Sequence, residues 1–185
     1  SNLQALTDFV NNNGVLILCS DGGIAANGRH VRCQAIINSI FDTNSFQPTS
    51  TENDNTQLFA TEVQSTAPVL NGPFDNLRGK SMARDDYYNF NFTGLTSDAS
   101  VISYSQAGDI RAFMHNNKGF LFIGDGGPFA YISNNTSAYN NPMKLDANNN
   151  PIVNTYGTVD TYNSFLFCNI MAWAIDYIQV NKPTR

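Results

Sequence analysis

Two short glycine-containing loops carry the residues of this sequence that are best suited to chemistry. Residues 19–23 read CSDGG and residues 124–127 read GDGG, and each loop follows an apolar run of strand length. Paired carboxylates beside an open backbone can hold a divalent cation or the hydroxyls of a sugar. Asp21 and Asp125 are therefore weak candidate metal ligands. The candidate ligand-binding residues are the two aspartates and the glycines that follow them: Asp21, Gly22, Gly23, Asp125, Gly126 and Gly127.

The same aspartates have a structural alternative. Asp-Gly pairs are common in turns, because the aspartate side chain bonds to nearby backbone N–H groups and glycine tolerates a positive φ. An aspartate at such a position can also cap the helix that follows it. Under this interpretation Asp21 and Asp125 shape their loops and bind no ligand. The sequence leaves both interpretations open.

Cys19 and His30 form a second candidate site, of the catalytic kind. A cysteine becomes a nucleophile when an adjacent histidine takes its proton. His30 falls near the start of the helix expected after the first loop, within possible reach of Cys19. The sequence shows no third group to orient this histidine, and a histidine in a first helical turn is commonly a surface residue. We expect His115, at a hairpin tip, to be exposed.

Residues 84–88 (RDDYY) combine charge with two aromatic rings in a turn-rich region. Aromatic rings stack on sugars while carboxylates bind hydroxyls, so this segment is a candidate carbohydrate platform. An exposed strand with alternating faces explains the same pattern. The sequence does not decide between the two.

Apolar runs and their periodicity indicate the elements that must position these loops. Residues 3–10 have helical spacing, residues 15–19 form a strand-length run expected to be buried on both faces, and a helix follows over about 29–41. This order is typical of α/β proteins. The other expected elements are strands at 58–63 and 101–105, a hairpin of 110–115 with 120–123, a long surface loop at 133–155, and a closing helix over about 162–180 that packs firmly against the sheet.

Composition limits the classes of function. The chain has 185 residues, 42% of them hydrophobic and 12% aromatic, and a net charge of −5. These values predict one folded domain over residues 1–185, with no basic surface for nucleic acid and no membrane span. The 26 asparagines are far above ordinary usage and are typical of exported bacterial proteins, so we expect an extracytoplasmic location: periplasmic, cell-surface or secreted. The three cysteines cannot all pair within one chain.

Three segments together resemble the class I glutamine-amidotransferase-like superfamily, in particular its ThuA-like and other non-amidotransferase branches. They are residues 3–23 (LQALTDFVNNNGVLILCSDGG), residues 68–74 (PVLNGPF), and residues 116–129 (NNKGFLFIGDGGPF) followed by 162–176 (YNSFLFCNIMAWAID). The resemblance implies a flavodoxin-like α/β fold, a mostly parallel sheet flanked by helices with an antiparallel hairpin at one edge. Because such domains normally begin with a strand, we expect N-terminal βα units upstream, in a longer protein.

The catalytic triad of that superfamily is not matched. Its nucleophile lies in a G-x-C-x-G elbow, whereas Ile17 and Asp21 occupy the glycine positions around Cys19. Its His-x-Glu pair falls where this chain reads GDGG at 124–127. We therefore expect a non-catalytic binding or interaction module of a larger exported protein, related to carbohydrate. Its expected partners are other domains of the same polypeptide and a carbohydrate or small polar ligand, with no cofactor unless a divalent cation binds. The alternative is a hydrolase-type enzyme using Cys19 with His30, or a metal held by Asp21 and Asp125.

Overall fold

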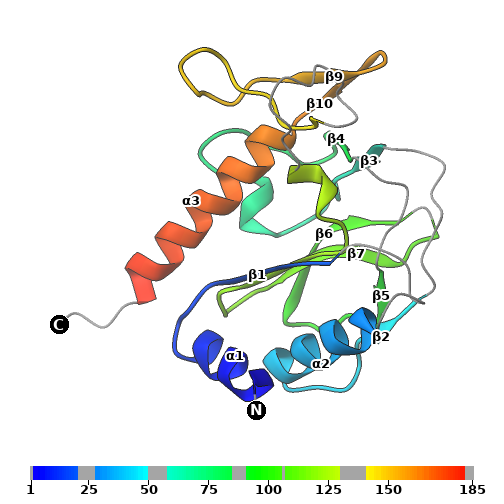
Figure 1. Cartoon of the computed structure of the whole chain (residues 1–185), viewed down its shortest axis with the longest axis vertical. Helices are drawn as coiled ribbons and strands as arrows, with labels where there is room; N and C mark the ends of the chain where they lie inside the picture. The colour runs from blue at the N-terminus through cyan, green and yellow to red at the C-terminus, as the bar shows by residue number, and fades with distance from the viewer. Residues whose placement is uncertain are drawn as a thin grey trace.

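The computed structural model describes residues 2–20, 28–49, 58–84, 91–105, 107–129 and 141–181, which form a mixed α/β structure (Figure 1). The elements, in chain order, are α1 (Asn2–Asn11), β1 (Leu16–Cys19), α2 (Arg29–Phe41), β2 (Gln47–Pro48), β3 (Leu58–Ala60), the 3-10 helix η1 (Pro68–Leu70), β4 (Ser81–Ala83), β5 (Phe92–Thr93), β6 (Ala99–Tyr104), β7 (Ile110–His115), β8 (Phe120–Ile123), the 3-10 helix η2 (Gly127–Phe129), β9 (Asn154–Tyr156), β10 (Val159–Thr161) and α3 (Asn163–Asn181). The helices expected near both ends of the chain and over 29–41 are confirmed within a residue or two.

The main sheet has the strand order β1-β8-β7-β5-β2, and β6 also pairs with β7. Only β1 and β8 run parallel among the described strands, and the other pairings of this sheet are antiparallel. The expectation of a mostly parallel sheet is therefore wrong for this part of the chain. Short connections are the reason: the turn 116–119 between β7 and β8, and the residues between β6 and β7, are too short for the crossover that parallel strands require.

The hairpin of β7 and β8 is confirmed, but it lies inside the sheet rather than at its edge. Phe113 pairs with Phe122 across the hairpin, while β1 adds to the other side of β8 in the register Leu16↔Phe120 to Cys19↔Ile123. The described sheet ends at β1, where the side chains from Leu16 to Leu18 are only partly buried. The expected burial of this strand on both faces is therefore not observed.

Two cores lie on opposite faces of the sheet because side chains alternate along its strands. Phe120 and Phe122 point to the face covered by α1 and α2, whereas Leu121 and Ile123 point to the face covered by η1 and α3 (Figure 1). His115 belongs to the first face: it is buried, 6% exposed, and its ring stacks on Phe41 at 4.5 Å. The expectation that His115 is exposed is wrong, because the residue still lies within β7 and under the end of α2.

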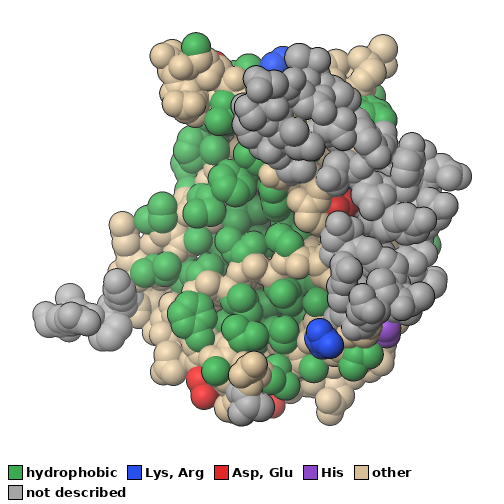
Figure 2. Space-filling model, viewed as in Figure 1, with side chains coloured by type: hydrophobic (Ala, Val, Ile, Leu, Met, Phe, Trp, Pro, Cys, Tyr) green, Lys and Arg blue, Asp and Glu red, His purple; other side chains and the backbone are tan. Residues whose placement is uncertain are grey.

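Helix α3 has one buried face and one exposed face. Leu166 and Ile170 are buried in the second core, Ala174 is also buried, and η1 and η2 are the helix's main packing partners. The opposite face exposes apolar side chains, among them Phe167, Met171 and Ile175, the last 53% exposed. Figure 2 shows hydrophobic side chains gathered over the region of α3. The expectation of firm packing is thus correct for one face only. No helix of the described residues is long and apolar enough to cross a membrane.

Part of the long loop expected at 133–155 forms ordered structure. Residues 130–140 lie outside the described part of the chain. After them, Leu145 and Pro151 form an isolated bridge, and Asp146 accepts hydrogen bonds from the backbone N–H groups of Asn148 and Asn150. The hairpin of β9 and β10 then leads directly into α3. Sequence periodicity missed this hairpin because each strand has only three residues.

Candidate functional site

The two glycine-containing loops leave the sheet at the same edge. Strands β1 and β8 are parallel neighbours, and Cys19 is paired with Ile123 at their carboxyl ends. Ligands of open α/β sheets bind beyond this edge of the strands. The sheet therefore brings together the starts of the two loops singled out in the sequence. Asp21, Gly22 and Gly23 lie outside the described residues, so a site shared by Asp21 and Asp125 stays a prediction.

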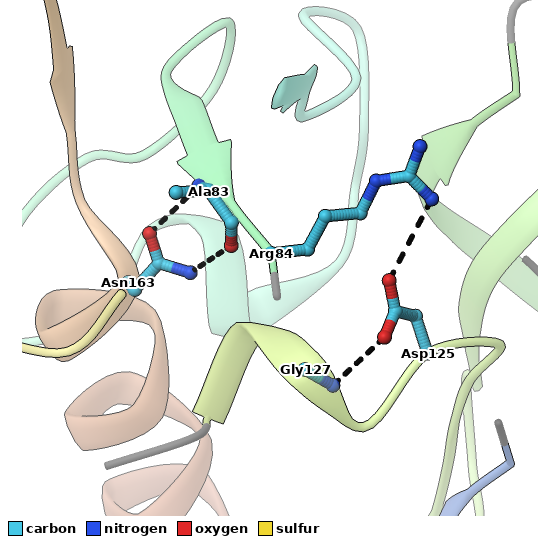
Figure 3. Close-up of polar contacts among 5 residues, drawn as sticks. All are labelled: Ala83, Arg84, Asp125, Gly127 and Asn163. Atoms are coloured by element: carbon cyan, nitrogen blue, oxygen red, sulfur yellow. Dashed lines mark hydrogen bonds and ion pairs between the residues drawn. The ribbon is translucent and has the colours of Figure 1, made fainter. Parts of the chain in front are cut away.

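Asp125 is completely buried, and its position is fixed by contacts that include those with Arg84 and Gly127 (Figure 3). One carboxylate oxygen, Oδ2, lies 3.6 Å from Nη1 of Arg84, whose side chain is also 0% exposed. The other, Oδ1, accepts a hydrogen bond of 2.7 Å from the backbone N–H of Gly127, at the start of η2. This is the geometry of the turn-forming alternative: the carboxylate shapes the loop and balances a buried cation.

The backbone conformation of the two residues after Asp125 does not require glycine. Neither Gly126 nor Gly127 has a positive φ, and a Cβ atom built on Gly126 would meet no atom within 4 Å. The suggestion that these glycines supply left-handed backbone is therefore wrong for this loop. Gly126 is partly exposed beside the buried carboxylate, so it is the accessible residue among the described members of the predicted site.

Arg84 is a site residue whose role the sequence did not reveal. It follows β4, and its guanidinium reaches the loop after β8. Its complete burial contradicts both interpretations of residue 84, as part of a carbohydrate platform and as part of an exposed strand. Residues 85–88 lie outside the described part of the chain. Nothing in the sequence connects Arg84 with Asp125, because their contact depends on the packing of β4 against η2.

A second buried arginine belongs to the strand whose backbone contacts the start of this loop. Arg111, on β7, is 2% exposed, and its guanidinium lies 5.0 Å from the centre of the Phe59 ring. Its backbone carbonyl accepts a hydrogen bond from the N–H of Gly124, which ties β7 to the start of the loop. A buried arginine is rare unless it is paired, and Arg84 and Arg111 are both buried arginines.

Asn163 connects the same region to α3. Its side chain exchanges two hydrogen bonds with Ala83, accepting at 2.9 Å from the N–H and donating at 2.7 Å to the carbonyl (Figure 3). It also donates at 2.9 Å to the carbonyl of Pro128 in η2. The residue next to Arg84 and the turn after Asp125 are therefore both held by the first residue of α3.

The environment of Cys19 opposes its ionisation. The residue is exposed at the end of β1, but the partial burial of the thiol raises its pKa, and the negative charge of Asp125 raises it further. A histidinium partner would lower the pKa of the thiol instead. His30 lies in the first turn of α2 and is partly buried. Both causes favour the protonated form of the Cys19 thiol.

Helix α2 approaches the first loop through a different cysteine. Cys33 is buried, and a hydrogen bond with the Ser20 side chain partly offsets the rise that burial causes in its pKa. The helix begins after Gly28, whose φ of 65° is left-handed, and it has no side-chain cap. Among the described residues no group of three or more His, Cys, Asp or Glu side chains could hold a metal ion.

Comparison with known proteins supports the fold and does not extend to a function. No family model matches the chain, and no curated protein matches it at a significant level. A crystal structure from Thermoplasma acidophilum, of a protein described as a "putative" GMP synthase subunit, matches 98% of this chain and 68% of its own length. The TM-score is 0.53 and the sequence identity is 10%. This likeness supports a fold of the broad glutamine-amidotransferase type, and the ThuA-like branch stays a prediction.

Proposed function

We propose that this chain is a non-catalytic binding or interaction module with a glutamine-amidotransferase-like fold. The observation that carries the proposal is the environment of Cys19, the residue at the nucleophile position of the resemblance. Both burial and Asp125 raise the pKa of its thiol, whereas a cysteine nucleophile must be a thiolate. These two causes support a thiol that stays protonated, and so favour a module that does not use Cys19 as a nucleophile.

Asp125 supports the same proposal from the other loop. Its carboxylate is buried, contacts Arg84 and accepts the hydrogen bond of the η2 turn. A carboxylate with these partners contributes to structure rather than to proton transfer. The ligand of such a module is then a carbohydrate or another small polar molecule, recognised without covalent chemistry.

Thiol alkylation tests the proposal directly. Intact protein is exposed to iodoacetamide over a range of pH, and the labelling of each cysteine is followed by peptide mass spectrometry. Cys19 should react slowly at neutral pH despite its exposure and faster only above the ordinary thiol range. Cys33, which is buried, and Cys168, which is partly buried, serve as internal controls. Rapid labelling of Cys19 near neutral pH, lost in His30→Gln, would reject the proposal.

The alternative is a hydrolase-type enzyme that works at the crevice through Cys19 and His30, or through a metal held by Asp21 and Asp125. It is favoured by one observation, the parallel pairing of β1 and β8 that brings the two loops to one edge. The metal version is tested by melting the protein with and without Ca²⁺ or Mg²⁺, and then repeating the experiment with Asp21→Asn. A metal-dependent rise in melting temperature that this variant abolishes would support the enzyme.

The proposed setting is a larger exported bacterial protein in which this module contacts other domains of the same polypeptide. Its support is the asparagine-rich composition, with 26 such residues. Antibodies against the purified domain, applied to intact and permeabilised source cells, test the location. Binding to intact cells or to the periplasmic fraction is expected, and detection only in the cytoplasmic fraction would reject it.

A further inference from the structure

A groove of about 340 Å³ lies between the η1 turn and α3. None of the residues that line it belongs to the two glycine-containing loops. Figure 1 shows the segment of η1 lying along α3. The rings of Pro68, Pro73 and Trp173 form apolar parts of the lining, and Asn71 and Asp176 provide polar groups. This combination of ring surfaces with a few polar groups is typical of sites for small polar ligands.

The floor of the groove is held rigidly by Asn169. This side chain is 1% exposed, accepts a 3.0 Å hydrogen bond from the N–H of Phe74 and donates one of 3.0 Å to the carbonyl of Asp75. The backbone of Gly72 approaches so closely that a Cβ atom there would lie 2.4 Å from Oδ1 of Asn169. The loop is thus fixed against α3 before any ligand arrives, which lowers the entropic cost of binding.

The polar groups at the rim are available to a ligand. Asp176 and Asn71 are exposed, and within the described part of the chain neither side chain has a hydrogen bond or an ion pair. Asn169, Trp173 and Asp176 follow one another at helical spacing, so they lie on one face of α3. The Trp173 ring packs at a tilt against Tyr177, with ring centroids 6.0 Å apart, which restricts its orientation.

We propose that this groove binds one pyranose ring of a neutral carbohydrate, which specifies the ligand class of the proposed binding module and rests on that function. The apolar C–H face of the sugar lies on Trp173, because the face of an indole ring attracts weakly positive hydrogens. The Asp176 carboxylate accepts hydrogen bonds from two neighbouring hydroxyls, and the Asn71 amide both donates and accepts. No covalent step is involved.

A larger hollow along α2 lacks this character. It measures about 540 Å³, and several polar side chains of its lining already bond within the protein. Gln34 and Asn38 both donate to the carbonyl of Phe46, and Ser39 shares a hydrogen bond with Thr7. Its lining contains no aromatic ring. The groove on α3 therefore carries the proposal.

The single tryptophan of the chain makes the proposal directly measurable. Trp173 fluorescence is recorded while the intact domain is titrated with glucose, galactose, mannose, xylose or N-acetylglucosamine. At least one sugar should give a saturable change. Asp176→Asn should weaken that binding by at least about tenfold, because it removes charge-assisted hydrogen bonds while keeping the size of the side chain. Asp160→Asn, an exposed change on β10, should leave it unaltered.

A second measurement is needed for Trp173→Phe, because this variant lacks the fluorescence that reports binding in the titration. Saturation-transfer NMR on the same sugars should show contact with the ring C–H groups in the native protein and in Asp160→Asn, and none in Trp173→Phe. Melting curves of Asp176→Asn and Asp160→Asn should remain close to that of the native protein, since both side chains are exposed. The proposal is overturned if no sugar saturates, if Asp176→Asn binds as well as the native protein, or if choline binds where sugars do not.

Failure here is distinguishable from failure of the proposed function. A reactive Cys19 in the alkylation experiment would reject the non-catalytic module whatever the sugars do. Slow alkylation of Cys19 combined with no sugar binding would reject this groove as a carbohydrate site, and the proposal of a non-catalytic module would stand.

Discussion

At the scale of single residues, the buried pair of Arg84 and Asp125 has the largest consequence for experiments on this protein. Both side chains are fully buried, and the carboxylate also holds the η2 turn through Gly127. Removing one partner of a buried ion pair leaves an uncompensated charge. Any variant at residue 125 therefore reports on folding as well as on ligand binding.

We predict that Asp125→Asn lowers the free energy of unfolding by about 3 kcal/mol, measured by urea denaturation. The substitution keeps an oxygen that can accept the hydrogen bond from Gly127 but removes the charge opposite Arg84. The double variant with Arg84→Met should cost less than the sum of the single changes, since the pair is lost together. Additive effects, or an Asp125→Asn cost no larger than that of Asp160→Asn, would contradict this role.

Because His115 is buried and its pKa is lowered, we predict that the stability of the protein depends on pH. Burial is the main cause that lowers its pKa to about 4 from an ordinary 6.5; Lys118 lowers it further and Asp98 opposes them. Between these values the unfolded chain binds a proton that the folded chain does not. The free energy of unfolding should therefore fall, by on the order of 3 kcal/mol, as the pH drops from about 6.5 to about 4.

The comparison variant for His115 is Gln, which retains an acceptor for the N–H of Asn117 that now bonds to Nδ1. Urea denaturation at several pH values should show a flatter profile for this variant over the same interval. Parallel profiles for the two proteins would mean that other groups cause the acid sensitivity.

At the scale of elements, close backbone approaches fix where short strands can lie. Gly94 follows β5, has a φ of +83°, and lies so close to the chain before β2 that a Cβ atom would be 1.8 Å from the carbonyl oxygen of Ser45. No side chain can be accommodated there without moving backbone. The pairing of β5 with β2 therefore depends on this glycine.

Gly94→Ala should accordingly destabilise the protein by more than about 1 kcal/mol, because it combines an unfavourable φ with a backbone clash. Gly126→Ala is the matched control: its φ is not positive and its Cβ position is open. The control should change the melting temperature little or raise it slightly. Equal effects of the two changes would contradict the described backbone.

The two faces of α3 give a second prediction at this scale. Ile170 is 2% exposed and Ile175 is 53% exposed on the same helix. Ile170→Ala should cost about 2–5 kcal/mol through lost burial and a cavity. Ile175→Ala should stay within about 0.5 kcal/mol. Denaturant unfolding of the two variants, which carry the same chemical change, measures the difference, and similar costs would show that α3 packs in another orientation.

Local patterns in the sequence predict most elements but not their partners. The helix at 29–41 and the hairpin at 110–123 follow from apolar spacing and from the turn 116–119, so they are found without tertiary information. Strand direction depends on which strands meet, and β9 and β10 are too short to show a period. The two glycine-containing loops were recognised in the sequence by their glycines. The contact between Arg84 and Asp125 could not be predicted, because it arises from packing between segments that are distant in the sequence.

At the scale of the whole molecule, the central strands β7 and β8 form the stable part of the structure. All described residues of β7 and β8 are buried, and each strand has partners on both sides. The hairpin of β9 and β10 is a separate two-stranded sheet with partly exposed residues. Stability against local opening should therefore differ strongly between them.

Amide hydrogen exchange measures this difference. Backbone amides bonded within β7 and β8 should exchange by global unfolding and be slower than those of β9 and β10 by at least about two orders of magnitude. Added denaturant should accelerate the β7 and β8 amides more steeply. Uniform exchange rates across the two sheets would show that the β9–β10 hairpin opens only with the whole protein.

The two cores also differ in chemistry, and this has a spectroscopic consequence. The core beneath α1 and α2 contains six mutually packed phenylalanines, Phe41, Phe46, Phe92, Phe113, Phe120 and Phe122. The buried members of the core beneath α3 are mainly aliphatic, and its other aromatic side chains, Phe129, Tyr162, Phe165 and Trp173, are only partly buried. Aromatic ring currents displace the proton resonances of methyl groups held over the rings. Ile37 and Ile40, which belong to the core with the six phenylalanines, should therefore give methyl signals upfield of the ordinary range, and these signals mark that side of the sheet. A one-dimensional proton spectrum can thus report separately on the two sides of the sheet, so that loss of one layer would be visible while the other persists.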